Sequence, residues 1–130
     1  MITNPDGKTI LPPWTNPAQP GLDNNVGAIH NTGVNPSRMT VPAGAAGLWL
    51  VIGLATWAGG AGAQRQTLLL KNGAGIITNV VTASAVYNPQ NVFAALLVLN
   101  VGDYLELQGY QDSGGNLTVV ATFAAVRLAA

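Results

Sequence analysis

The stretch NVGDYLELQGYQDSGGNLTVVATFAAVR, residues 100–127, carries the clearest structural pattern in the chain. From 104 to 110 polar and apolar side chains alternate, which is typical of a half-buried β-strand. The sequence SGGN at 113–116 predicts a tight turn, because glycine reaches positive φ without steric cost. Residues 117–127 alternate again, so we expect a second strand that pairs with the first as a hairpin.

Other segments carry strand signals separated by turn residues. The run GLWLVIGLATW at 47–57 is apolar on both faces, which predicts a strand covered on both sides. Asn72-Gly73 is a strong hairpin signal between 65–71 and 76–82. Further strand candidates are 26–32, 39–42 and 92–99. About eight strands without helical periodicity predict an all-β fold, a β-sandwich or jelly roll of about 8–10 strands.

Composition limits the classes of protein that fit. The chain has 130 residues, no cysteine, and five basic residues that cancel five acidic ones. Charged residues are 8% of the chain, against about 25% in a typical domain. No basic patch predicts nucleic-acid binding. The uncharged run 41–63 contains Pro42 and several glycines, so we expect no membrane insertion. So low a charge instead predicts association with copies of the chain or with a larger particle.

The N-terminal region differs from the rest. Residues 1–21 hold five of the eight prolines, so we expect an extended arm without regular structure, followed by one sandwich domain at 22–130. The arm has apolar side chains without a core of their own. Two readings stay open: the arm docks on a neighbouring subunit or another protein, or it packs on its own domain. The candidate docking residues are Ile10, Leu11, Pro12, Pro13 and Trp14.

Four motifs in order resemble the jelly rolls of the complement globular-head and tumour necrosis factor-like superfamily. They are RMTVPAGAAGLWLVIGLATWA at 38–58, TLLLKNGAGI at 67–76, LNVGDYLELQGYQDSGGNLTV at 99–119 and TFAAVRL at 122–128. The Gly-Asp-Tyr strand and Ser-Gly-Gly turn are similar to domains of bacteriophage virion proteins. Trp49 stands where the family usually has tyrosine, and Met39 where it has phenylalanine.

The resemblance implies a homotrimer in which apolar strands meet along a threefold axis. Trp49, Tyr104 and Phe123 are then candidates for the trimer interface. The alternative is that they are ordinary core side chains.

No enzymatic chemistry, cofactor or metal site is expected. His30 is the only histidine, so one chain cannot build a multi-histidine metal site. Asp103 and Glu106 are three apart on one expected strand and face opposite sides, so they cannot act as a paired acid and base.

We therefore expect a non-enzymatic structural protein of a bacteriophage virion, most simply a trimeric capsid decoration protein docked by its N-terminal arm. The alternative is the receptor-binding tip of a tail fibre, which binds a host-surface saccharide or protein. The loop residues Tyr87, Asn88, Gln90 and Asn91 could then supply an aromatic face and amides. A secreted adhesion module is a third reading.

Overall fold

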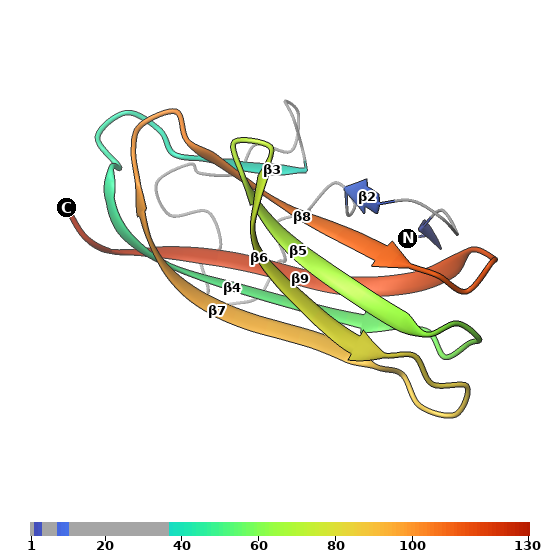
Figure 1. Ribbon diagram of the computed structural model, residues 1–130. Helices are drawn as coiled ribbons and strands as arrows, with labels where there is room; N and C mark the ends of the chain where they lie inside the picture. The colour runs from blue at the N-terminus through green and yellow to red at the C-terminus, as the bar shows by residue number, and fades with distance from the viewer. Residues whose placement is uncertain (1, 4–7, 11–36) are drawn as a thin grey trace, which may run out of the picture.

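A computed structural model describes residues 2–3, 8–10 and 37–130. Within these residues every regular element is a β-strand (Figure 1). The strands are β1 (Ile2–Thr3), β2 (Lys8–Ile10), β3 (Arg38–Thr40), β4 (Gly47–Trp57), β5 (Gln64–Lys71), β6 (Ala74–Thr82), β7 (Gln90–Leu99), β8 (Tyr104–Gln111) and β9 (Leu117–Ala129). They form two antiparallel sheets in a sandwich-like arrangement, which confirms the all-β prediction.

The first sheet has the strand order β1-β9-β4-β7, and β4 lies at its centre. This strand pairs along its whole length with β7 on one side and β9 on the other. Its odd-numbered residues 49–57 face the second sheet and are buried, whereas its even-numbered residues face outward. A strand with apolar residues at both parities suits this central position.

The second sheet has the order β2-β8-β5-β6, and β3 also pairs with β8. β2 and β3 lie along the same edge of β8, opposite residues 108–110 and 104–106 respectively. The β5–β6 hairpin is confirmed: Asn72 and Gly73 both have positive φ, as the two-residue turn requires.

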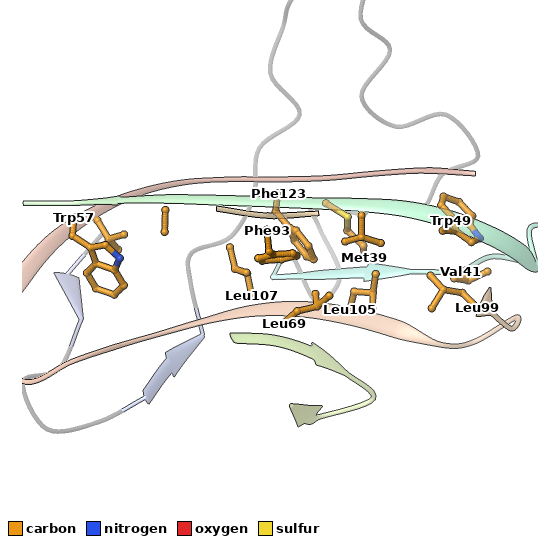
Figure 2. Close-up of a cluster of buried hydrophobic side chains, with 13 residues drawn as sticks. Met39, Val41, Trp49, Trp57, Leu69, Phe93, Leu99, Leu105, Leu107 and Phe123 are labelled. Carbon is orange, nitrogen blue, oxygen red and sulfur yellow. The ribbon is translucent and has the colours of Figure 1, made fainter. Parts of the chain in front are cut away.

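The hydrophobic core fills the space between the two sheets (Figure 2). Trp57 and Trp49 lie toward its two ends, with Phe93 and Phe123 between them. Leu69, Leu105 and Leu107 of the second sheet complete it, and all three are fully buried. The strand alternation therefore places bulky side chains inward from both layers.

The predicted hairpin between the strands of 100–127 is wrong. Both strands exist with the expected faces, but β8 pairs with β5, and β9 pairs with β4 in the other sheet. The glycine-rich segment 112–116 thus crosses from one sheet to the other. Period-two alternation fixes which side chains point inward, but it carries no information about which strand is the neighbour.

The expectation that the N-terminal region lacks regular structure is wrong at five residues. Ile2 and Thr3 pair with β9, and residues 8–10 pair with β8, so both sheets of the same chain are extended by this region. Backbone pairing along a strand edge needs no apolar periodicity, so these two short strands could not be predicted from the pattern of residues. The strand candidate 26–32 lies outside the described residues.

Candidate functional site

The outer surface of the first sheet is uncharged. It is formed by the even-numbered residues 48–56 of β4, 90–98 of β7 and 118–126 of β9, which we call the sheet face. None of these residues is acidic or basic, and nearly all of them are apolar or threonine. Val120, Val98 and Leu96 are 69%, 68% and 61% exposed. Large contiguous apolar surfaces are unusual on monomeric proteins, so the sheet face is a candidate interaction site.

Strand register joins these side chains into rows across the sheet. Leu50 lies between Val126 and Leu96, and Ile52 lies between Ala124 and Ala94. A row of large side chains therefore lies beside a row in which Ile52 is flanked by two alanines. The sheet face thus has raised and recessed positions that another apolar surface could fit.

The outer surface of the second sheet carries charged side chains, which the sheet face lacks. Arg38 Nε donates to Glu106 Oε1 at 2.9 Å, and this hydrogen bond raises the pKa of Arg38. The same guanidinium lies 4.0 Å from the centroid of the Tyr104 ring, in cation–π geometry. Glutamine and threonine side chains occupy many of the remaining outward positions on β5, β6 and β8. This surface also carries Leu68 and Leu70, each 7% exposed, and the exposed Ile76 and Val80, so it mixes charged, polar and apolar side chains.

None of the three candidate interface residues lies on the sheet face. Trp49 and Phe123 are in the core of a single chain, which is the alternative left open by the sequence. Trp49 Nε1 donates to the Ala45 carbonyl at 3.1 Å, so even its polar atom is used within the chain. Tyr104 lies on the other sheet, beneath Arg38. Sequence reasoning favoured the bulkiest side chains, but these fill the core, and smaller Val, Leu and Ala residues form the sheet face.

Three connections meet at one end of the molecule, at the right of Figure 1. They are the β4–β5, β6–β7 and β8–β9 connections, residues 58–63, 83–89 and 112–116, which we call the loop end. Main-chain hydrogen bonds join the first two: Gly60 N donates to Ser84 O at 2.9 Å, and Ala83 N donates to Ala63 O at 3.1 Å. The loop end is therefore a connected surface rather than three independent loops.

Asp112 joins the β8–β9 connection to the β4–β5 connection and to the start of β5. Asp112 Oδ1 accepts hydrogen bonds from Gln64 N at 3.0 Å and Ala63 N at 2.9 Å, and these bonds lower the pKa of Asp112. Arg65 is completely buried, and its Nη1 lies 3.6 Å from Asp112 Oδ1. Burial lowers the pKa of this guanidinium, which nevertheless stays charged.

The four candidate ligand residues divide into two groups. Tyr87, Asn88 and Gln90 are exposed, but Asn91 is buried and hydrogen-bonded to Trp57 and Asn79 inside the protein. Asn91 is thus a structural residue, and three of the four remain on the surface.

The opposite end carries a second polar cluster. Asp103 accepts hydrogen bonds from the Asn72 side chain at 2.8 Å and from Asn100 N at 2.9 Å, and its Oδ2 lies 2.9 Å from Lys71 Nζ. Together, with the Asn72 bond contributing most, these partners hold the pKa of Asp103 at about 2. The cluster ties the β5–β6 turn to the β7–β8 turn.

Among the described residues, no group of three His, Cys, Asp or Glu side chains could hold a metal ion. The part of the chain that the structure describes also contains no helix long and apolar enough to span a membrane. His30 and the arm residues 11–14 lie outside the described residues. Ile10 pairs through its backbone with Gln108.

Comparison with known proteins gives neither a matching family model nor a matching curated protein.

Proposed function

We propose that this protein is a non-enzymatic structural module that assembles into a homotrimer through the sheet face. The observation that carries the proposal is the absence of any charged residue from that face, together with its exposed Val and Leu side chains. Burying such a side chain fully contributes about 1.5–3 kcal/mol. Burial of a row of them is the favourable contribution that would offset the cost of association, about 4–15 kcal/mol.

A trimer with cyclic symmetry needs two different surfaces that fit each other, because its interface is heterologous. The second surface we assign is the outward side of β6, where this strand lies beside β7, and we call it the β6–β7 edge. Its segment 74–82 contains no charge. Ile76 and Val80 of β6 are 42% and 51% exposed there. The opposite edge of the sandwich has short strands and the charged Arg38, features that discourage association. The sheet face of one copy would thus pack on the β6–β7 edge of the next.

A charge pair tests this arrangement. Ile52→Lys puts a cation on the sheet face, and Val80→Glu puts an anion on the β6–β7 edge, both at exposed positions that tolerate a charge in the monomer. Each single variant should sediment as a monomer at micromolar concentration. The double variant should recover the trimer, because every interface then holds one cation and one anion.

The control is Thr40→Lys, at an exposed position of β3 on the edge opposite β6, which should stay trimeric. If Ile52→Lys instead recovers association when mixed with Ile52→Glu, the interface is isologous and the trimer is wrong. A wild-type chain that sediments as a monomer rejects self-assembly itself.

Jelly-roll topology is part of the proposal. The two four-strand paths β1-β9-β4-β7 and β2-β8-β5-β6, and the connections that cross between sheets on either side of the β5–β6 hairpin, support it. The resemblance of the strand motifs to complement globular-head and tumour necrosis factor-like domains points the same way.

Within this class we propose a decoration protein on the capsid of a bacteriophage, with the N-terminal arm as its docking element. Deleting the whole arm would also remove β1 and β2, which pair with β9 and β8. The sharper variant is therefore Leu11→Ser with Trp14→Ser, which leaves both strands in place. It should remain a trimer by sedimentation and lose binding to capsids that lack the protein. A variant that still saturates capsids would reject docking by these side chains.

The receptor-binding tip of a tail fibre is the second candidate. The observation that favours it is the apex of the β6–β7 connection, where Val86 and Tyr87 are 80% and 75% exposed. Attachment of the isolated protein to host cells, without binding to capsids, would support this candidate over the first.

A further inference from the structure

Hydrogen bonds hold the β6–β7 connection on both sides of its exposed apex. Ser84 Oγ accepts hydrogen bonds from Val86 N at 3.2 Å and Tyr87 N at 3.0 Å. At the other side of the apex, Pro89 O accepts from Trp57 N at 3.0 Å. Because the backbone on both sides of Tyr87 is hydrogen-bonded, a ligand that binds this side chain should cost little conformational entropy in the loop.

Amide groups flank the exposed tyrosine. Asn88 Oδ1 accepts from Gly59 N at 3.1 Å, which leaves the Asn88 Nδ2 group available as a donor. Gln90 Nε2 donates to Thr56 Oγ1 at 3.2 Å, which leaves the Gln90 Oε1 atom available as an acceptor. Each side chain is thus oriented by one hydrogen bond and keeps its other polar atom for a partner. Both are exposed.

Among the described residues, the connections around Tyr87 carry no unpaired charge. Across the loop end the connections consist of Ala, Gly, Ser, Asn, Pro, Val, Tyr and the single Asp112, whose carboxylate is engaged by two backbone amides and Arg65. Arg65 itself is buried. A charged ligand would therefore gain no ion pair here, whereas a neutral ligand with an apolar face and hydroxyl groups matches the groups present.

We propose that Tyr87, Asn88 and Gln90 form a binding site for neutral sugar residues of a glycan. The phenol ring offers an apolar face to the C–H side of a pyranose, and its hydroxyl and the two amides can hydrogen-bond to sugar hydroxyls. The site lies within one chain and goes beyond the assembly function. A trimer would present three such sites and multiply a weak affinity through effective concentration.

The test is an NMR titration of the full-length, nitrogen-15-labelled protein with maltose, cellobiose, N,N′-diacetylchitobiose and, as an anionic comparison, digalacturonic acid. At least one neutral disaccharide should shift the amides of residues 83–90 and of Gly59, with a dissociation constant on the order of millimolar. Tyr87→Ala should weaken that binding by about tenfold or more, since stacking is lost. Tyr87→Phe should keep most of it.

Two comparisons separate this site from assembly. Val101→Ala, at an exposed residue of the opposite end, should bind the disaccharide as the wild type does. Ile52→Lys should also bind with the same affinity per site, whether or not it is trimeric. Failure of the trimer would therefore leave the sugar result unaffected.

The proposal is overturned if no neutral disaccharide at about 50 mM shifts these amides, well above a millimolar dissociation constant. It is also overturned if Tyr87→Ala binds as tightly as the wild type, or if only the anionic sugar binds. If no neutral disaccharide binds, the exposed Val86 and Tyr87 would instead suit a pocket of a partner protein.

Discussion

The indole Nε1 of Trp57 donates a 2.8 Å hydrogen bond to Oδ1 of Asn91, and both side chains are fully buried. Asn91 Nδ2 in turn donates to the main-chain and side-chain oxygens of Asn79, at 3.0 and 2.7 Å. Asn79 lies on β6 and Asn91 on β7, the edge strands of the two sheets. This network therefore fastens the two sheets together along one side of the sandwich.

Replacing Asn91 by leucine should lower the free energy of unfolding by about 2–4 kcal/mol, because Trp57 Nε1 and Asn79 O lose their partners in a buried site. Urea denaturation followed by tryptophan fluorescence measures the loss. Trp57→Phe combined with Asn91→Leu should cost less than the sum of the two single changes, since removing both partners leaves no orphaned indole N–H. Additive losses would mean that the two side chains are not coupled.

The apolar run 47–57 and the alternation in 117–127 were enough to predict two strands, and the alternation placed Val119 and Phe123 on a shared face. It could not predict that β9 joins β4 rather than β8, because pairing depends on contacts distant in sequence. Among the candidate ligand residues, the burial of Asn91 could not be predicted for the same reason. A polar side chain beside a loop resembles a surface residue in sequence, and only the packing of Trp57 and β6 against it shows that it is buried.

Gly53 lies in the middle of β4, where any side chain would enter the core. Its register partners are Phe93 and Phe123, and a Cβ at this position would collide with the ring of Phe93. Gly53→Ala should therefore destabilise the protein by about 1–3 kcal/mol in thermal or urea unfolding. Phe93→Leu should relieve part of the collision in the double variant.

Gly115→Ala is the matched control, since no atom lies within 4 Å of the Cβ that it would add. A change of less than about 0.5 kcal/mol is expected there. An equal effect at Gly53 and Gly115 would mean that backbone freedom, and not the Phe93 ring, determines the cost.

The Asp103 cluster predicts that the stability of the wild type and that of the Asn72→Asp variant respond differently to pH. Asp103 has a folded-state pKa lowered to about 2, chiefly by the Asn72 side chain, so its stabilising contribution is present above the unfolded pKa. In the wild type that contribution, on the order of 1 kcal/mol, should be lost as the pH falls from about 4 toward 2. Asn72→Asp replaces the donor by a second carboxyl group and should lower the free energy of unfolding at pH 7 by about 1 kcal/mol.

On acidification the Asn72→Asp variant should approach the wild type in stability, because protonating one carboxyl group restores a donor between the two side chains. Unfolding curves at pH 3, 5 and 7 test this, with Asp103→Asn as the control that removes the titrating group. A constant difference between Asn72→Asp and wild type at all three values would contradict coupling between residues 72 and 103.

Arg65 stabilises the loop end through its shape as well as its charge. Its guanidinium donates to Ala61 O at 2.8 Å, Gly60 O at 3.3 Å and Gln64 O at 3.0 Å from a fully buried position. A lysine ammonium cannot reach these carbonyls together, so Arg65→Lys should cost about 2–3 kcal/mol although the charge is retained. Hydrogen exchange should accelerate at the Gly60, Ala63 and Gln64 amides before it does at the central residues of β4. Exchange that accelerates uniformly would mean that Arg65 supports the whole fold rather than the frame from which Tyr87 projects.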